Sequence, residues 1–160
     1  MTGPITASNA RVHDAIARAL ETHRLDVMRC DATAAARSWA AFASRLERHI
    51  ADEDELIRPI HQAACEAEPA PRGGSVDIVD RDHDKLRRHL EEIGRQLTAL
   101  TSRTEPAAFL ALLDRQKVLA DLLEHHDLRE TDLVYPRVDA AATPEQEHRI
   151  RARFDAAVDA

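Results

Sequence analysis

Four histidines and two glutamates recur in a doubled pattern, and both residue types are common ligands of transition metals. A single His precedes a His-x-x-x-Glu segment, and the same order then returns later in the chain. Residues four apart lie one turn apart on the same face of an α-helix, so the His and Glu of each segment can reach one metal centre or bridge two. The pattern therefore predicts a two-metal site with six ligands. These are His13, His49, Glu53, His83, His126 and Glu130.

The repeat extends beyond the ligands themselves. Each glutamate is followed three residues later by a leucine and six residues later by a proline, Pro59 in the first half and Pro136 in the second. A proline inside a helix removes a backbone hydrogen bond and kinks or ends the helix. We interpret the two prolines as kinks or helix ends without a chemical role.

Helical periodicity decides which histidines face inward. His49 and Glu53 continue the apolar stripe of their helix, at about 100° per residue. The neighbouring histidines His23, His89 and His125 fall off the stripes of theirs. The chosen residues also match in height along the bundle. His49 lies about 24 Å beyond the connection between the first two helices, and His13 precedes that connection by a similar distance. His83 and His126 are equally well matched across the connection between the last two main helices, so all six side chains can converge.

The elements that position these residues are long helices, and no segment resembles a strand. Short polar connections predict two antiparallel hairpins, joined by a segment at 66–75 that contains Pro and Gly. A capping box at Thr143 and Gln146 predicts a short fifth helix, to about 157, packed outside the bundle. Residues 1–8 show no periodicity and are predicted to be loose. The four main helices are expected at about 9–30, 33–64, 77–102 and 105–138.

Length and charge limit the function classes. A chain of 160 residues with 44% hydrophobic and 32% charged residues fits one helical domain, 1–160. The net charge of -7 argues against nucleic acid or an anionic membrane as a partner. No signal peptide or membrane-spanning stretch is recognisable, so we expect a cytoplasmic protein. Cys30 and Cys65 are expected at opposite ends of the bundle, as free thiols.

A simpler interpretation is a bundle without metal, because one histidine on an apolar stripe is usually an ordinary core residue. Here four inward histidines and two inward glutamates match in height, and burying two carboxylates without a cation is costly. The metal site is therefore preferred. Asp52, Asp54 and Glu55 are predicted to face solvent or the flanks of the helix. The histidines expected at the surface are His23, His61, His89, His125 and His148.

The ordered pattern resembles the hemerythrin-like, or HHE cation-binding, family over about residues 10–138. This resemblance implies an up-down-up-down antiparallel four-helix bundle, at about 9–138, that holds two Fe ions as an oxo- or hydroxo-bridged di-iron centre. Glu53 and Glu130 would bridge the irons. One iron would take His13 and His49, and the other His83 and His126. The ligand types alone also suit manganese or zinc.

The chain departs from the oxygen-carrying hemerythrins at two positions. Those proteins have a further His four residues after the position of His83 and an Asp five residues after the position of His126, where this chain has Arg87 and Thr131. Each iron would keep an open position. Arg87 can either pair with a bridging carboxylate or attract an anion, or it can turn its guanidinium outward.

The leading hypothesis is a hemerythrin-like di-iron protein that binds or reacts with a small diatomic or peroxide ligand. The alternatives are an iron-sensing or iron-centre-repair module, which reads metal occupancy through folding, and an unmetallated structural bundle. A ferritin-like oxidase fits less well, because that architecture uses Glu-x-x-His. No metalloprotease signature, phosphate loop or catalytic triad is present. Whether the protein is an enzyme is left open, with peroxide or nitric oxide chemistry as candidates.

Overall fold

The computed structural model describes residues 3–101 and 103–159, and this part of the chain is helical without a strand. The predicted all-α class is confirmed. The elements are α1 (Pro4–Met28), α2 (Ala32–Asp52), η1 (Glu53–Ile57), α3 (Arg58–Ala67), α4 (Val76–Thr98), α5 (Pro106–Arg129), η2 (Glu130–Val134), α6 (Tyr135–Ala141) and α7 (Pro144–Asp159).

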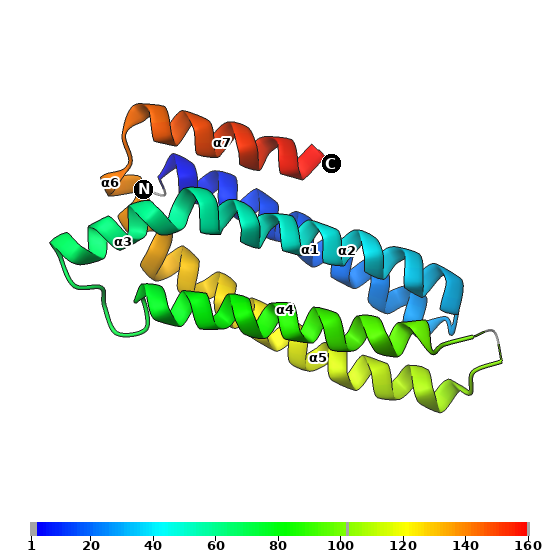
Figure 1. Cartoon of the computed structure of the whole chain (residues 1–160). Helices are drawn as coiled ribbons and strands as arrows, with labels where there is room; N and C mark the ends of the chain where they lie inside the picture. Colours follow the sequence, from blue (N-terminus) through cyan, green and yellow to red (C-terminus); the bar gives the residue numbers. More distant parts are fainter. Residues whose placement is uncertain (1–2, 102, 160) are drawn as a thin grey trace.

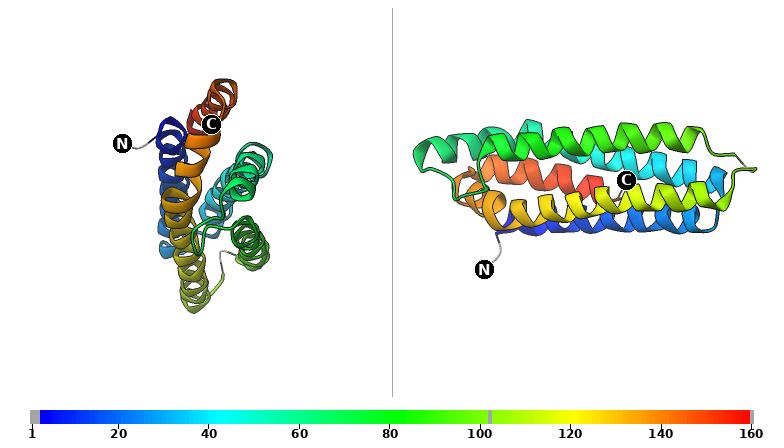
Figure 2. Two further views of the ribbon diagram at one scale, coloured as in Figure 1. Left: turned by 90° about the vertical axis from the view of Figure 1, so that its left-hand side faces the viewer. Right: turned by 90° about the horizontal axis from the view of Figure 1, so that it is seen from below.

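Four long helices, α1, α2, α4 and α5, lie side by side along the length of the molecule (Figures 1 and 2). Helix α1 packs against α2 and α5, and α4 packs against α2 and α5. Helix α7 lies outside them, mainly against α1, as expected for the fifth helix (Figure 1). The four long helices therefore surround a shared interior.

Apolar side chains repeating at helical spacing fill that interior. Four of them are completely buried: Phe42 and Leu46 in α2, Leu86 in α4 and Leu119 in α5. Full burial of such a side chain contributes roughly 1.5–3 kcal/mol. The aromatic rings of Trp39 and Phe42 pack with centroids 5.3 Å apart. This core holds the helices in the register on which any site between them depends.

The N-terminal segment is ordered from residue 3, so the prediction that residues 1–8 are loose is wrong for the residues described; positions 1 and 2 lie outside them. Helix α1 begins at Pro4, and Ile5 is fully buried. The Asp139 carboxylate accepts the backbone N–H of Ile5 at 2.8 Å and that of Thr6 at 3.2 Å. A carboxylate near the end of the chain thus caps the first helix, as an N-cap residue normally does from within it.

Each of the two predicted helices that carry a His-x-x-x-Glu segment contains a short π-helical segment. In η1 the N–H of Arg58 donates to the carbonyl of Glu53, and in η2 the N–H of Tyr135 donates to that of Glu130. Pro59 and Pro136 follow directly. A proline clashes with the carbonyl four residues before it, and a wider π turn moves that carbonyl away. The predicted kinks are therefore observed as π turns.

His61 is buried, so its prediction as a surface residue is wrong. Its Nε2 lies 2.8 Å from the carbonyl oxygen of Gly74, in the loop that connects α3 to α4. That loop turns at Gly73, whose φ of 94° suits glycine, and returns along α3. The hydrogen bond is a loop contact that helical periodicity does not reveal. Helix α4 then ends at Thr98, before the predicted end at 102, which lies outside the described residues.

His23 is also buried, again contrary to the prediction. Its Nδ1 lies 3.0 Å from the Ala35 carbonyl, and its Nε2 lies 2.6 Å from the side-chain amide nitrogen of Gln116. The neutral ring satisfies both contacts, by donating from Nδ1 and accepting at Nε2. His23 is therefore a polar link between α1, α2 and α5, remote from the six predicted ligands.

Burial lowers the pKa of His23 to about 4. The unfolded chain takes up this proton below about pH 6.5, whereas the folded protein takes it up only near pH 4. The free energy of unfolding therefore decreases as the pH is lowered through this window. We expect His23→Gln, which keeps a neutral donor and acceptor, to reduce this pH-dependent loss by up to about 3 kcal/mol. Urea unfolding of both proteins at pH 7 and pH 4.5 measures the difference. Equal losses in the two proteins would contradict it.

Helix α7 begins with the predicted capping box. The N–H of Gln146 donates to Thr143 Oγ1 at 3.2 Å, and the N–H of Thr143 donates to Gln146 Oε1 at 2.8 Å. The helix also buries Asp52, contrary to its predicted solvent position, because Arg153 donates to its carboxylate at 2.6 Å. Asp52, the last residue of α2, thus attaches α7 to the helix that carries His49.

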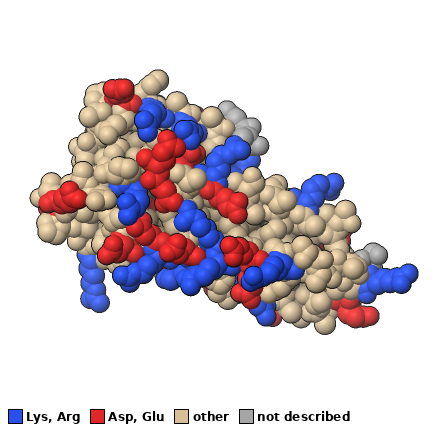
Figure 3. All heavy atoms as spheres, in the orientation of Figure 1, with Lys and Arg blue, Asp and Glu red and all other residues tan. Residues whose placement is uncertain are grey.

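The surface carries charges of both signs. Acidic and basic side chains alternate over the face in Figure 3, so that face has no continuous basic patch for a phosphate backbone. Cys30 and Cys65 are free thiols, as predicted. Within the described residues, no helix has the length and apolar character needed to cross a membrane.

Candidate metal centre

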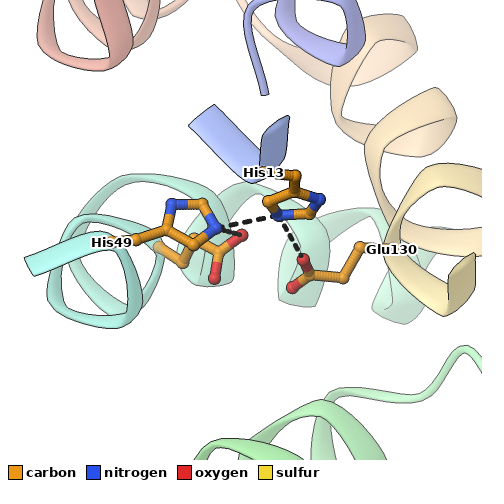
Figure 4. Close-up of side chains that lie close together, drawn as sticks. His13, His49 and Glu130 are labelled. Carbon is orange, nitrogen blue, oxygen red and sulfur yellow. Dashed lines mark hydrogen bonds and ion pairs between the residues drawn. The ribbon is translucent and has the colours of Figure 1, made fainter. Parts of the chain in front are cut away.

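All six predicted ligands meet inside the helices, in two overlapping groups. The first group contains two histidines and both glutamates. His13 Nε2 lies 2.9 Å from His49 Nε2 and 3.4 Å from Glu130 Oε2, and His49 Nε2 lies 3.3 Å from Glu53 Oε1. Figure 4 shows His13, His49 and Glu130 pointing toward one another from three helical segments. With Glu53 included, the four side chains of the first group come from α1, α2, η1 and η2.

The second group shares the same two glutamates with the other two histidines. His83 Nε2 lies 3.3 Å from Glu53 Oε2, and His126 Nε2 lies 3.3 Å from Glu130 Oε1. In each group the four candidate ligand atoms lie within 4.8 Å of one another. Each group therefore has two imidazoles of its own, and Glu53 and Glu130 stand between the groups.

The donor atoms fit a cation. All six residues are at most 8% exposed. Six of their polar atoms have no hydrogen-bond partner among the described residues. Four of these lie against other members of the groups, namely Glu53 Oε2, Glu130 Oε2, His83 Nε2 and His126 Nε2, and the other two are His49 Nδ1 and His126 Nδ1. Buried polar atoms are normally satisfied, and an ion is one of the few explanations for a cluster of exceptions. Imidazole and carboxylate together suit zinc, iron and manganese.

The two glutamates differ strongly in their electrostatics. Burial and the neighbouring Glu53 carboxylate raise the pKa of Glu130 well above its usual value. Burial acts in the same direction on Glu53, but the imidazoles of His49 and His83 outweigh it and lower the pKa of Glu53. Two adjacent buried carboxylates cannot both ionise without a counter-charge. A divalent cation between them would supply that charge.

Three of the imidazoles have shifted pKa values. Burial lowers the pKa of His49 to about 4 and that of His126 to about 3, so both are neutral near pH 7 and can bind metal. Burial also opposes charge on His83, but the Glu53, Glu130 and Asp54 carboxylates outweigh it and raise its pKa to about 9. Without a metal, His83 holds the positive charge that a cation would replace.

Both glutamates occupy the first position of a π turn. Widened turns inside α-helices occur frequently at functional sites. Helix α3 follows η1 directly and α6 follows η2 directly, so the segments that begin with Glu53 and Glu130 lead straight into these two helices. The candidate metal ligands are thus coupled to the local course of the backbone.

Sequence reasoning missed the residues behind the ligands. Asp54 Oδ1 lies 3.0 Å from His83 Nδ1, and Arg87 donates to Asp54 Oδ2 at 2.6 Å. Arg87 therefore pairs with Asp54, and neither Glu53 nor Glu130 is its partner among the described residues. Its half-exposed guanidinium matches the outward alternative. Asp54, which was expected at the surface, is only half-buried but makes this inward contact.

Three further side chains surround the first group. Asp127 Oδ1 lies 3.5 Å from His13 Nδ1, and the amide nitrogen of Asn9 lies 3.1 Å from His13 Nε2. The buried Tyr135 hydroxyl donates to Glu53 Oε1 at 2.5 Å. Asn9 precedes His13 by four residues, and this helical spacing is a signal that could have identified it. Tyr135 comes from 82 residues away, and no local pattern indicates it.

The remaining histidines take no part in the two groups. His125 and His148 are exposed and His89 is half-buried, which broadly fits their assignment to the surface. His23 and His61 are buried in the hydrogen bonds described above. The preference for His13, His83 and His126 over their neighbours therefore agrees with the side chains that the structure brings together.

Asp54 is expected to support metal binding by orienting His83. Hydrogen bonds from a second carboxylate to a metal-binding imidazole typically improve affinity by about 10–100-fold. We therefore expect Asp54→Asn to weaken binding at the His83 group by about that factor, measured by competition with a calibrated chelator. Asp84→Asn is the matched control, because the Asp84 side chain is exposed and lies 3.9 Å from the same arginine. Equal affinities in both variants would remove Asp54 from this role.

Comparisons with known proteins add no relative. The chain matches no protein-family model, no curated protein and no solved structure.

Proposed function

We propose that this protein is a hemerythrin-like two-metal protein with iron in both positions. The carrying observation is the pair of buried groups that share Glu53 and Glu130, with four ligand atoms otherwise left without partners. The resemblance in the order and spacing of the six residues supports iron and an up-down-up-down arrangement of α1, α2, α4 and α5.

In this proposal, His13 and His49 would hold one metal, His83 and His126 would hold the other, and Glu53 and Glu130 would contribute to both positions. Bound iron would supply a redox-active Lewis acid that takes oxygen, nitric oxide or peroxide as a ligand. The chain contributes the surroundings of that centre. Its apolar core excludes water, Asp54 orients His83, and the Tyr135 hydroxyl holds one oxygen of Glu53.

The direct test is the metal content of freshly purified protein, measured by mass spectrometry. We expect about two iron ions per chain, in line with the two groups. An optical spectrum that changes on adding azide or peroxide would identify an accessible iron position. A folded, metal-free protein that refuses iron during anaerobic reconstitution would leave the structural bundle as the better interpretation.

A second candidate is an iron-sensing module, and the π turns favour it. Glu53 and Glu130 begin the turns that lead into α3 and α6, so their engagement by metal bears directly on the conformation of those helices. A partner protein that recognises α3 or α6 would then respond to iron. Chelation distinguishes the two candidates, because an iron sensor should lose helicity over much of the fold, whereas a small-ligand protein should respond mainly near the π turns.

A further inference from the structure

A groove with a volume of about 520 Å³ runs between α1 and α5, which lie next to each other along the molecule (Figure 2). Its walls extend from Ala17 to Met28 on α1 and from Ala120 to Leu128 on α5. Its base is apolar, because the lining residues Leu20 and Leu123 are buried. None of the six candidate metal ligands lines it. We call it the α1–α5 groove.

Three large apolar side chains in the α1–α5 groove are exposed to solvent. Leu25, Met28 and Leu128 are 43%, 65% and 55% exposed. Among the described residues, only two other large apolar side chains are exposed to this degree, Leu110 and Val118, and neither lines the groove. An exposed apolar patch with a polar edge commonly marks an interaction site on a soluble protein. The exposed apolar surface of this protein is therefore concentrated where a partner could cover it.

Charges of both signs lie among these apolar side chains. Glu21 and Arg24 line the groove from α1, and Glu124 lines it from α5. None of the three has an ion-pair partner among the described residues, whereas Lys117 and Asp121, further along α5, pair at 2.8 Å. A surface of one charge would satisfy only part of this set. A surface that also carries both charges among apolar groups is complementary to it.

The α1 side of the groove is complementary to a second copy of itself. Four of its residues follow one another at intervals of four, three and four positions, so they share one face of the helix: Ala17, Glu21, Arg24 and Met28. In an antiparallel pair of such helices about a two-fold axis, one register places Arg24 opposite Glu21 of the partner subunit. The same register places Met28 opposite Ala17 of the partner subunit, because the two pairs of positions have the same midpoint along the helix. The ion pair then forms twice, and each long Met28 side chain covers a small alanine.

From these observations we infer that the α1–α5 groove is the interface of a symmetric dimer, in which α1 of one copy packs antiparallel against α1 of a second copy. Two-fold interfaces use the same patch on both subunits, and Met and Arg are enriched in protein interfaces. The apolar side chains supply the affinity, and the pairing of Arg24 with Glu21 of the partner subunit fixes the register. This interface goes beyond the proposed function and does not depend on a bound metal.

Sedimentation velocity of the protein as purified tests the inference, at concentrations from about 1 μM to about 1 mM. We expect a reversible equilibrium between monomer and dimer. Met28→Glu places a charge in the apolar contact and should weaken the dimer by at least about tenfold. Leu110→Glu is the matched control, because Leu110 is 62% exposed and lies outside the groove, and it should dimerise as the wild type does. A wild-type monomer over the whole range, or equal weakening by both variants, would overturn the inference.

Charge reversal tests the register. Arg24→Glu and Glu21→Arg each place like charges opposite each other, so each should weaken the dimer by about tenfold at low salt. The double variant restores opposite charges and should recover the wild-type dimer, whereas failure to recover would overturn the antiparallel α1 interface.

Native mass spectrometry of the same proteins tests for a different occupant of the groove. We expect dimers without a bound small molecule. Monomers that carry a co-purified apolar compound, absent from Met28→Glu, would assign the groove to a small ligand and overturn the dimer.

Discussion

Replacing Glu53 by glutamine is expected to remove both metal ions, although the change alters a single side chain. Glu53 belongs to both ligand groups, so its amide variant weakens each of them. Loss of a supporting contact already lowers metal affinity by about 10–100-fold, and loss of a ligand carboxylate should lower it by about a hundredfold or more. Metal content after gel filtration, measured by mass spectrometry, should fall from about two ions per chain to nearly none.

The same substitution should leave the metal-free protein folded. A neutral amide at position 53 no longer raises the pKa of Glu130, and it also no longer raises the pKa of His83, so the two electrostatic effects of the change oppose each other. Glutamine can also keep the hydrogen bond from Tyr135. Loss of metal from a protein that stays folded therefore separates a ligand defect from misfolding.

Two comparisons make this prediction specific. Glu55→Gln is the matched control, because Glu55 lies two residues further along the same acidic run and its side chain is 55% exposed. His49→Ala removes a ligand from the first group alone and should leave one metal bound beside His83. A Glu53→Gln protein that keeps two metals would show that Glu53 is not shared between the positions.

The convergence of the six candidate ligands was predictable because it depends on local spacing. Residues four apart on a helix share a face whatever the rest of the chain does, so His49 with Glu53, and His126 with Glu130, follow from the sequence. Matching heights across short connections then bring the helices together at one level. The assembled groups agree with this expectation.

The surroundings of the centre were not predictable, because they depend on contacts between distant segments. The carboxylate of Asp139 caps a helix that begins 134 residues earlier, and Tyr135 reaches Glu53 across 82 residues. His23 and His61 are buried through contacts with Gln116 and with the loop at Gly74, neither of which has a periodic signal. The π turns hardly change the spacing of apolar residues along the sequence. The prolines that follow them are therefore the only sequence feature that indicates these turns.

Removing the metal is expected to lower the melting temperature by roughly 15 °C or more. A ligand at about a thousand times its Kd stabilises the native state by about 4 kcal/mol, and two metal positions double that contribution. For a domain of this size each kcal/mol corresponds to about 2–4 °C. Chelation also returns four buried polar atoms to the state in which they have no partner among the described residues. Thermal unfolding of the protein before and after dialysis against a chelator measures the shift.

The region that loses hydrogen-exchange protection after chelation distinguishes the two proposed functions. A small-ligand protein needs a preformed centre, so hydrogen exchange after chelation should increase mainly in η1, η2, α3 and α6, where the π turns meet the glutamates. An iron sensor needs a larger response, and α4 and α5 should then lose protection together with far-ultraviolet helicity. The Glu53→Gln protein is the control, because a chelator should have nothing to remove from it. A chelator-induced shift of equal size in that variant would mean that the stabilising metal lies elsewhere, whereas no shift in the wild type would favour the unmetallated bundle.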